Sequence, residues 1–135
     1  MKFEQTIDAR ENPKEQLLEI FDGELPTAIF DATGSSKSMH SAFDYIAHGG
    51  KLIFVGLFKG DITFNDPYFH SHELSIMSSR NATAQDFDHV IASLQNGGVS
   101  LDGWITHRAS PEQLVTDFAS WLKPETGVIK AMLEM

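Results

Sequence analysis

The 135-residue sequence predicts an α/β fold, in which a parallel β-sheet carries helices on its faces. Short, continuous apolar runs with strand character alternate with longer segments that have helical periodicity. The first two such runs are separated by one amphipathic segment, which is the arrangement of a parallel strand–helix–strand crossover. Helix start and stop signals delimit the helical segments.

The first half of the chain predicts a helix and then three strands. The helix begins at Asn12, with Pro at the first helical position and Glu15 completing a capping-box-like pattern, and it ends at Asp22-Gly23. Residues 27–32 (TAIFDA) and 51–56 (KLIFVG) are apolar and predict buried strands, and residues 74–77 predict a third. The segment between the first two strands predicts a helix with a single apolar face: Met39, Ala42, Phe43, Ile46 and Ala47.

The connection between the second and third strands departs from this pattern. The seventeen residues 57–73 show no helical period, whereas a parallel sheet normally places a helix there. Ile62 and Phe64 alternate with polar residues. We therefore expect an extended edge strand within residues 57–65, with an irregular surface loop as the alternative.

The second half predicts two more helices and two short strands. Residues 83–86 and 110–113 are helix starts, and the second of them is a capping box with Pro at the first helical position. Residues 104–106 and 128–133 predict strands. The last helix is expected to pack through an apolar stripe: Leu114, Val115, Phe118 and Leu122.

Composition excludes several classes of function. Ten Lys and Arg residues against nineteen Asp and Glu residues leave a net charge of −9, which argues against binding nucleic acid or an anionic membrane surface. There is neither an apolar run of the ~20 residues that a membrane span needs nor a secretory signal. The absence of cysteine excludes disulfides, thiol catalysis and Cys-ligated metals, and it fits a reducing compartment. We expect a cytoplasmic protein.

Three strand ends carry small or polar residues, and ligands of open α/β sheets bind beyond the carboxyl ends of the strands. The sequence therefore predicts one ligand-binding crevice at these ends, with ordinary tight turns as the alternative. Its residues are those of Asp31-Ala32-Thr33-Gly34, Val55-Gly56-Leu57 and Ser78-Ser79-Arg80.

Other chemistry has weaker support. His70 and His72 could present two imidazoles on one face of a strand near Asp66, but no third ligand is specified, so a polar exposed connection is the simpler interpretation. The glycine-rich phosphate-binding motifs and the G-x-S-x-G nucleophile motif do not occur. We assign no catalytic and no metal-binding residue to this chain.

The motifs DATG, HGGKLIFVGL, SRNATAQDFDHVI, WITHR and GVIKAMLEM follow one another in an order that resembles the medium-chain dehydrogenase superfamily. Within it, the sequence is similar to the C-terminal portion of the zinc-type alcohol, polyol and sugar-acid dehydrogenases, from about Phe3 to Met135. The resemblance implies a partial Rossmann-like sheet without the first βαβ unit and its glycine-rich turn. FEQTIDA would be its third strand. It further implies one domain over residues 1–135, of which about 101–135 form a return segment.

The resemblance also implies a function. NAD(P) would bind with its nicotinamide half against three groups of residues, Thr33 and Gly34, Val55, Gly56 and Leu57, and Ser79, Arg80 and Asn81. Lys130 would reach the cofactor phosphates. The zinc ligands of the family belong to its N-terminal catalytic domain, so this chain alone is expected to be inactive. In dimeric members the segment corresponding to 57–65 pairs across a two-fold axis, which implies a homodimer or larger homo-oligomer. The alternatives are a non-catalytic oligomerising remnant or interaction module and, less well supported, a methyltransferase-like domain.

Overall fold

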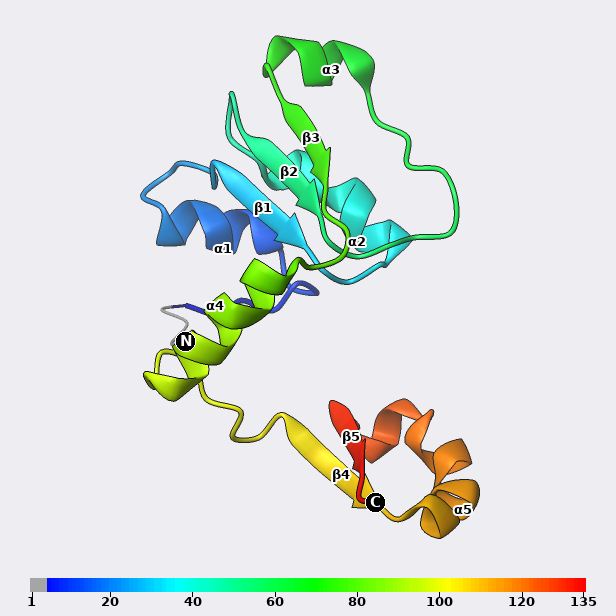
Figure 1. Cartoon of the computed structure of the whole chain (residues 1–135). Coiled ribbons are helices and arrows are strands. Elements are labelled where there is room, and N and C mark those ends of the chain that lie inside the picture. The colour runs from blue at the N-terminus through cyan, green and yellow to red at the C-terminus, as the bar shows by residue number, and fades with distance from the viewer. Residues whose placement is uncertain (1–4) are drawn as a thin grey trace. The chain divides into compact units, whose positions relative to one another are not determined.

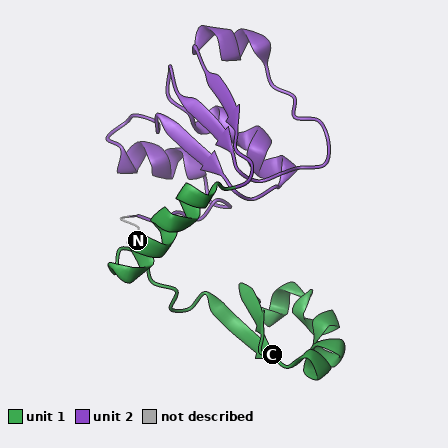
Figure 2. Cartoon of the chain, viewed as in Figure 1, with its two compact units in different colours: residues 1, 82–135 green, residues 2–81 purple. Residues whose placement is uncertain are grey.

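The computed structural model describes residues 5–135 (Figure 1). The chain divides into two compact units, residues 2–81 and residues 82–135 (Figure 2). Each unit is described by itself.

A three-stranded parallel sheet forms the centre of the unit of residues 2–81. Strands β1 (Ala28–Asp31), β2 (Lys51–Phe54) and β3 (Ser75–Ser78) lie in the order β1-β2-β3 (Figure 1). The predicted strand–helix–strand crossover and the parallel sheet are therefore confirmed. The predicted strand FEQTIDA is not confirmed, because residues 5–9 contain no strand, and the rest of that segment lies outside the described residues.

The core of this unit lies between the sheet and the helix that follows β1. Helix α2 (Ser36–Ser41) continues directly into a 3₁₀ turn, η1 (Ala42–Tyr45). The predicted apolar face is confirmed up to Ile46, since the buried cluster consists of Ala42, Phe43, Ile46, Leu52 and Leu74. Gly49-Gly50 then turns the chain into β2, and the Gly49 amide donates to the His72 carbonyl at 2.7 Å.

The first helix forms as predicted, but not with the predicted cap. Helix α1 spans Pro13–Ile20. Asn12 has a left-handed backbone conformation, with φ 45°, and its side chain makes no capping hydrogen bond. Pro13, which has no N–H to satisfy and a φ suited to the first turn, begins the helix without that cap.

The connection between β2 and β3 corrects our expectation. No strand forms within residues 57–65, and a short helix, α3 (Asp66–Ser71), occupies part of the crossover. The Asn65 side chain caps α3 by accepting from the Tyr68 amide at 3.0 Å. Six residues are too few to display a helical period in the sequence, which explains why the pattern did not reveal α3.

Ile62, Thr63 and Phe64 contact other parts of their own unit. Ile62 lies against the core cluster. The Phe64 ring stacks on Phe43 with 5.3 Å between centroids and lies 4.9 Å from the Phe69 ring. The Thr63 amide donates to His40 Nε2 at 3.2 Å. The alternation that suggested an edge strand therefore reflects contacts with the core.

The strands are not buried on both faces, contrary to the expectation for TAIFDA and KLIFVG. Leu52 is fully buried, and Asp31 is also buried. On the other face, Phe30, Ile53 and Met77 stand in register across the three strands, and Phe30 and Met77 are 69% and 52% exposed. Continuous apolar runs thus gave correct strand positions but overestimated burial.

The unit of residues 82–135 contains α4 (Ala84–Gln95), β4 (Ile105–Ala109), α5 (Pro111–Trp121), the 3₁₀ turn η2 (Pro124–Thr126) and β5 (Lys130–Leu133). The strands β4 and β5 pair in parallel. Capping boxes begin both helices, from Thr83 to Asp86 and from Ser110 to Gln113, so both predicted helix starts are confirmed.

The apolar stripe of α5 is not a core. Val115 is 86% exposed, Phe118 and Leu122 are more than half exposed, and α5 contains no buried residue. A two-stranded sheet offers too little area to cover such a helix face. Within the described residues, no helix is both long and apolar enough to cross a membrane.

Candidate functional site

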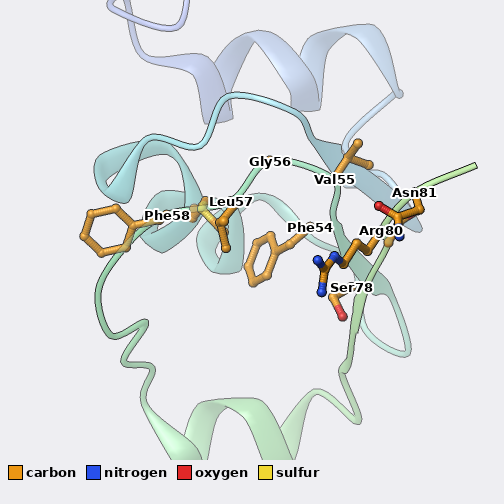
Figure 3. Close-up of a pocket in the computed structure, with 10 residues that line it drawn as sticks. Phe54, Val55, Gly56, Leu57, Phe58, Ser78, Arg80 and Asn81 are labelled. Carbon is orange, nitrogen blue, oxygen red and sulfur yellow. The ribbon is translucent and has the colours of Figure 1, made fainter.

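Two of the three predicted strand ends meet at a cavity of about 500 Å³ in the unit of residues 2–81. It opens at the carboxyl ends of β2 and β3, and Figure 3 shows the side chains around it. This location is the one expected for a ligand of an open parallel sheet. The lining residues are Met39, Phe54, Val55, Gly56, Leu57, Phe58, Ser78, Ser79, Arg80 and Asn81.

The cavity has a divided chemical character. Val55 and Leu57 are 50% and 81% exposed, so apolar surface is available on the β2 side. Ser79, Arg80 and Asn81 supply polar groups on the β3 side. Asn81 has φ 64°, a left-handed conformation that asparagine tolerates better than most residues and that turns the chain away from β3.

Gly34, which follows β1, packs against the turn that forms the β2 side of this cavity. A Cβ on Gly34, which has φ 63°, would lie 2.9 Å from the Leu57 carbonyl oxygen. A Cβ on Gly56 would lie only 2.3 Å from the Gly34 amide nitrogen. The two glycines therefore allow the turns after β1 and β2 to pack backbone against backbone, and they hold the β2 side of the cavity in place.

Thr33 has a structural role in this unit. Its amide and hydroxyl both donate to Asp31 Oδ1, at 2.9 and 2.7 Å, and its hydroxyl accepts from the Ser35 amide. Ser38 donates to Asp31 Oδ2 at 2.6 Å. Burial alone would raise the pKa of the Asp31 carboxyl, but these hydrogen bonds outweigh it, and the net pKa lies below its usual value. Thr33 does not line the cavity.

The sequence placed Asp31 at a strand end but gave it no role of its own. The signal was present, because an aspartate that ends an apolar strand and precedes Thr33 and Ser38 can be satisfied by local hydroxyl donors. Asp31 fixes the turn on which Gly34 lies, and it is therefore a positioning residue for the cavity.

Lys130, the remaining predicted cofactor residue, lies elsewhere. It is the exposed first residue of β5, in the unit of residues 82–135. Its carbonyl accepts from the Thr106 hydroxyl at 3.3 Å. Its cofactor role stays a prediction.

The histidine pair does not form a metal site. His70 belongs to α3 and pairs with Asp66 at 3.1 Å, whereas His72 follows the helix and its Nδ1 lies 3.0 Å from the Tyr68 carbonyl. In a helical segment, side chains two residues apart point to different faces, so these imidazoles do not converge as they would on a strand. Across residues 5–135, no group of three His, Cys, Asp or Glu side chains could hold a metal ion. The described residues therefore offer no ligand set for the zinc ion of the family, whose ligands the resemblance assigns to another domain.

Comparison with known proteins identifies the family. The model of the zinc-binding dehydrogenase family matches residues 1–96. The chain belongs to the zinc-binding dehydrogenases. As the ordered motifs indicated, the part that it matches is the C-terminal portion of the zinc-type medium-chain enzymes.

Curated relatives of this zinc-binding dehydrogenase chain act on polyols and sugar acids. L-galactonate-5-dehydrogenase of Escherichia coli K12 is 44% identical over 93 residues, which is 69% of this chain and 27% of that protein. L-arabinitol 4-dehydrogenase of Aureobasidium melanogenum is 24% identical over 131 residues, or 95% of this chain and 35% of that protein. The chain thus spans about a third of the length of these relatives.

Solved structures show the same fold. Alcohol dehydrogenase TADH from Thermus sp. ATN1 superposes with a TM-score of 0.83 at 19% identity, over 96% of this chain and 37% of that one. A short chain alcohol dehydrogenase from E. coli CFT073, complexed with NADH, superposes with a TM-score of 0.78 at 25% identity, over 98% and 39%. The Rossmann-like α/β class predicted from the sequence is therefore confirmed.

The cavity residues fit the nicotinamide half of NAD(P). A volume of about 500 Å³ lies within the roughly 300–1,000 Å³ of small-ligand sites. The apolar surface of Val55 and Leu57 suits a flat ring, and Ser79 and Asn81 offer donors and acceptors for an amide. The sequence contains no glycine-rich loop for the pyrophosphate.

Proposed function

We propose that this chain forms the nicotinamide-side wall of an NAD(P)-dependent, zinc-type alcohol, polyol or sugar-acid dehydrogenase. The observation that carries the proposal is the cavity at the carboxyl ends of β2 and β3, in a chain of the zinc-binding dehydrogenase family. In such enzymes the nicotinamide accepts hydride from an alcohol carbon while zinc polarises the alcohol oxygen.

The chain's own contribution is binding and orientation. Val55 and Leu57 pack against one face of the ring and exclude water from it. Ser79 and Asn81 hydrogen-bond the carboxamide and so fix the rotation of the ring. Asp31 and the two glycines keep the strand ends in position. A role of Lys130 in binding the cofactor phosphates is part of the same proposal.

The substrate class follows from the relatives. L-galactonate and L-arabinitol, the substrates in the names of the curated relatives, are polyhydroxylated, and both carry secondary alcohols. We infer a polyol or sugar-acid substrate for the complete enzyme. A cytoplasmic location belongs to this proposal and is supported by the absence of cysteine from the sequence.

Binding of a cofactor fragment tests the proposal. Nicotinamide riboside, added to the ¹⁵N-labelled chain, should shift the amide resonances of residues 55–57 and 78–81, and leave those of α3 unchanged. Shifts that are absent from residues 55–57 and 78–81 at millimolar riboside would overturn the assignment of the cavity.

Calorimetry with NAD(H) tests whether this chain alone can bind the complete cofactor. We expect weak binding and no dehydrogenase activity from the chain alone, because the sequence contains no glycine-rich turn of the kind that holds the pyrophosphate at a helix N-terminus. Micromolar affinity for NADH would contradict this expectation.

A second candidate is an oligomerising module without catalytic function. Its support is the apolar surface that each unit exposes, including Phe30 at 69% and Val115 at 86%. Exposed strand edges and apolar faces favour association with another copy.

We propose a homodimer or larger homo-oligomer, with residues 57–65 as the contact. Sedimentation equilibrium at micromolar concentration should show it, and a monomer there would rule it out. Leu57, which is 81% exposed, offers the test variant Leu57→Glu.

A further inference from the structure

Arg80 differs from the other two arginines of this chain. Arg10 pairs with Asp8 at 2.6 Å, and Arg108 pairs with Glu134 at 2.7 Å. Within residues 5–135, the Arg80 side chain has neither an ion pair nor a hydrogen bond. A chain with nineteen carboxylate side chains and a net charge of −9 thus leaves one guanidinium without a carboxylate partner.

This unpaired guanidinium lies at the cavity. Arg80 is the only ionisable residue among the ten that line it. Figure 3 shows its guanidinium group extending from the end of β3 toward Phe54 and Ser78, on the cavity side of the strand. The cavity therefore combines uncharged lining residues with one exposed positive charge.

That combination selects a particular ligand chemistry. A guanidinium presents five N–H donors in a planar fork, which matches the two oxygens of a carboxylate. A charge-assisted pair of this kind is stronger beside apolar surface than in open water. A hydroxyl group in the same place accepts fewer hydrogen bonds and brings no charge.

We propose that Arg80 binds the carboxylate of a sugar-acid substrate and makes the enzyme selective for aldonates over neutral polyols. The inference rests on the proposed function and narrows its substrate class. A phosphate of the cofactor is the other source of an oxyanion. We favour the substrate carboxylate over a cofactor phosphate for two reasons. The cavity fits the nicotinamide half of the cofactor, and the substrate must lie close to the nicotinamide for hydride transfer. The sequence also contains no pyrophosphate-binding loop.

Two matched pairs of ligands separate these sources. L-galactonate and galactitol differ by a carboxylate in place of a hydroxymethyl group. Nicotinamide mononucleotide and nicotinamide riboside differ by a phosphate. Each is titrated into the ¹⁵N-labelled chain, and dissociation constants are taken from the amide shifts of residues 78–81.

Three variants assign the effect to Arg80. Arg80→Gln removes the charge and keeps a polar, shorter side chain. Arg80→Lys keeps the charge but loses the planar fork. Arg108→Gln is the matched control, because it removes an arginine that already pairs with Glu134 in the other unit. Far-UV circular dichroism confirms that each variant is folded.

The unmodified chain should bind L-galactonate about tenfold or more tightly than galactitol, as expected for one charge-assisted hydrogen-bonded pair. Arg80→Gln should abolish that preference, Arg80→Lys should retain part of it, and Arg108→Gln should retain all of it. Equal affinities for galactonate and galactitol, or a preference that survives Arg80→Gln, would overturn the proposal.

Comparing nicotinamide mononucleotide with nicotinamide riboside distinguishes binding of a substrate carboxylate from binding of a cofactor phosphate at Arg80. If Arg80→Gln weakens the mononucleotide but not the riboside and leaves galactonate unchanged, Arg80 binds a cofactor phosphate and the proposal is wrong. If the riboside causes no shift at residues 55–57, the proposed function fails, whatever happens with galactonate.

Discussion

Gly56 lies so close to Gly34 that a Cβ on Gly56 would come within 2.3 Å of the Gly34 amide nitrogen and 3.0 Å of the Gly34 Cα. The contact joins the turns that follow β1 and β2. Backbone cannot move aside as a flexible side chain can, so this contact determines the shape of the cavity's β2 side.

Gly56→Ala should therefore destabilise the unit of residues 2–81. We expect a loss of about 1–3 kcal/mol in the free energy of unfolding, as for other overpacked sites, measured by urea denaturation. Gly98→Ala is the control, because its Cβ would meet only the Ser93 carbonyl oxygen at 3.3 Å. Equal effects of the two substitutions would show that the turns separate easily.

Asp31→Asn should weaken the turn that carries Thr33 and Gly34. The asparagine amide has one acceptor oxygen where the carboxylate has two, so either the Ser38 or the Thr33 donors lose their acceptor. A loss of about 1–3 kcal/mol is expected near neutral pH. Asp88→Asn on exposed α4 serves as the control and should have little effect.

The pH dependence of the same variant provides a second measurement. The folded pKa of Asp31 lies below the unfolded value of 3.8, so its stabilisation is present in full well above 3.8 and is lost as the pH falls from there through the folded pKa. The difference in unfolding free energy between the unmodified chain and Asp31→Asn should shrink over that range. A difference independent of pH would contradict the assignment of a charged, hydrogen-bonded Asp31.

Ser110→Ala should destabilise α5. The Ser110 hydroxyl accepts from the Gln113 amide in a capping box, and removing such a cap costs about 1 kcal/mol. Ser35→Ala is a matched control at the N-cap of α2, where the side chain makes no capping hydrogen bond. Hydrogen exchange at the Gln113 amide should accelerate in the first variant. Unchanged exchange there would mean that the cap contributes nothing.

His40→Gln should release the segment around Thr63. His40 Nδ1 lies 2.7 Å from the Ser36 carbonyl, which assigns the proton to Nδ1 and leaves Nε2 to accept from the Thr63 amide. Exchange of the Thr63 amide should accelerate about fivefold or more on losing this bond. The exposed residue His89, on α4, provides the control His89→Gln. A protected Thr63 amide in His40→Gln would show that Ile62 and Phe64 hold the segment without the histidine.

The sequence predicted helices best where caps and periodicity agreed. Thr83 and Ser110 both begin helices as predicted, because capping chemistry depends on residues only three positions apart. Asn12 shows the limit of this logic, since its side chain was free to cap and its backbone adopted a left-handed conformation instead.

The candidate site could be predicted in outline. Two of the predicted strand ends, at Val55–Leu57 and Ser79–Asn81, line the cavity, and their role in binding a cofactor stays a prediction. Thr33 was chosen by the same rule but hydrogen-bonds Asp31, because a hydroxyl two residues from a buried carboxylate finds its nearest acceptor there.

The sequence by itself determined the α/β class, the positions of the five observed strands and of helices α1, α4 and α5, and the family, because these depend on periodicity, caps and ordered motifs that are readable along the chain. Only the tertiary structure decided that Ile62 packs on the core and Phe64 on Phe43 instead of lying on a strand, that Val115 and Phe30 stay exposed, and that Arg80 faces a cavity without a carboxylate partner. Each of these depends on residues distant in sequence meeting, or failing to meet, in space. Neither periodicity nor composition encodes those distances.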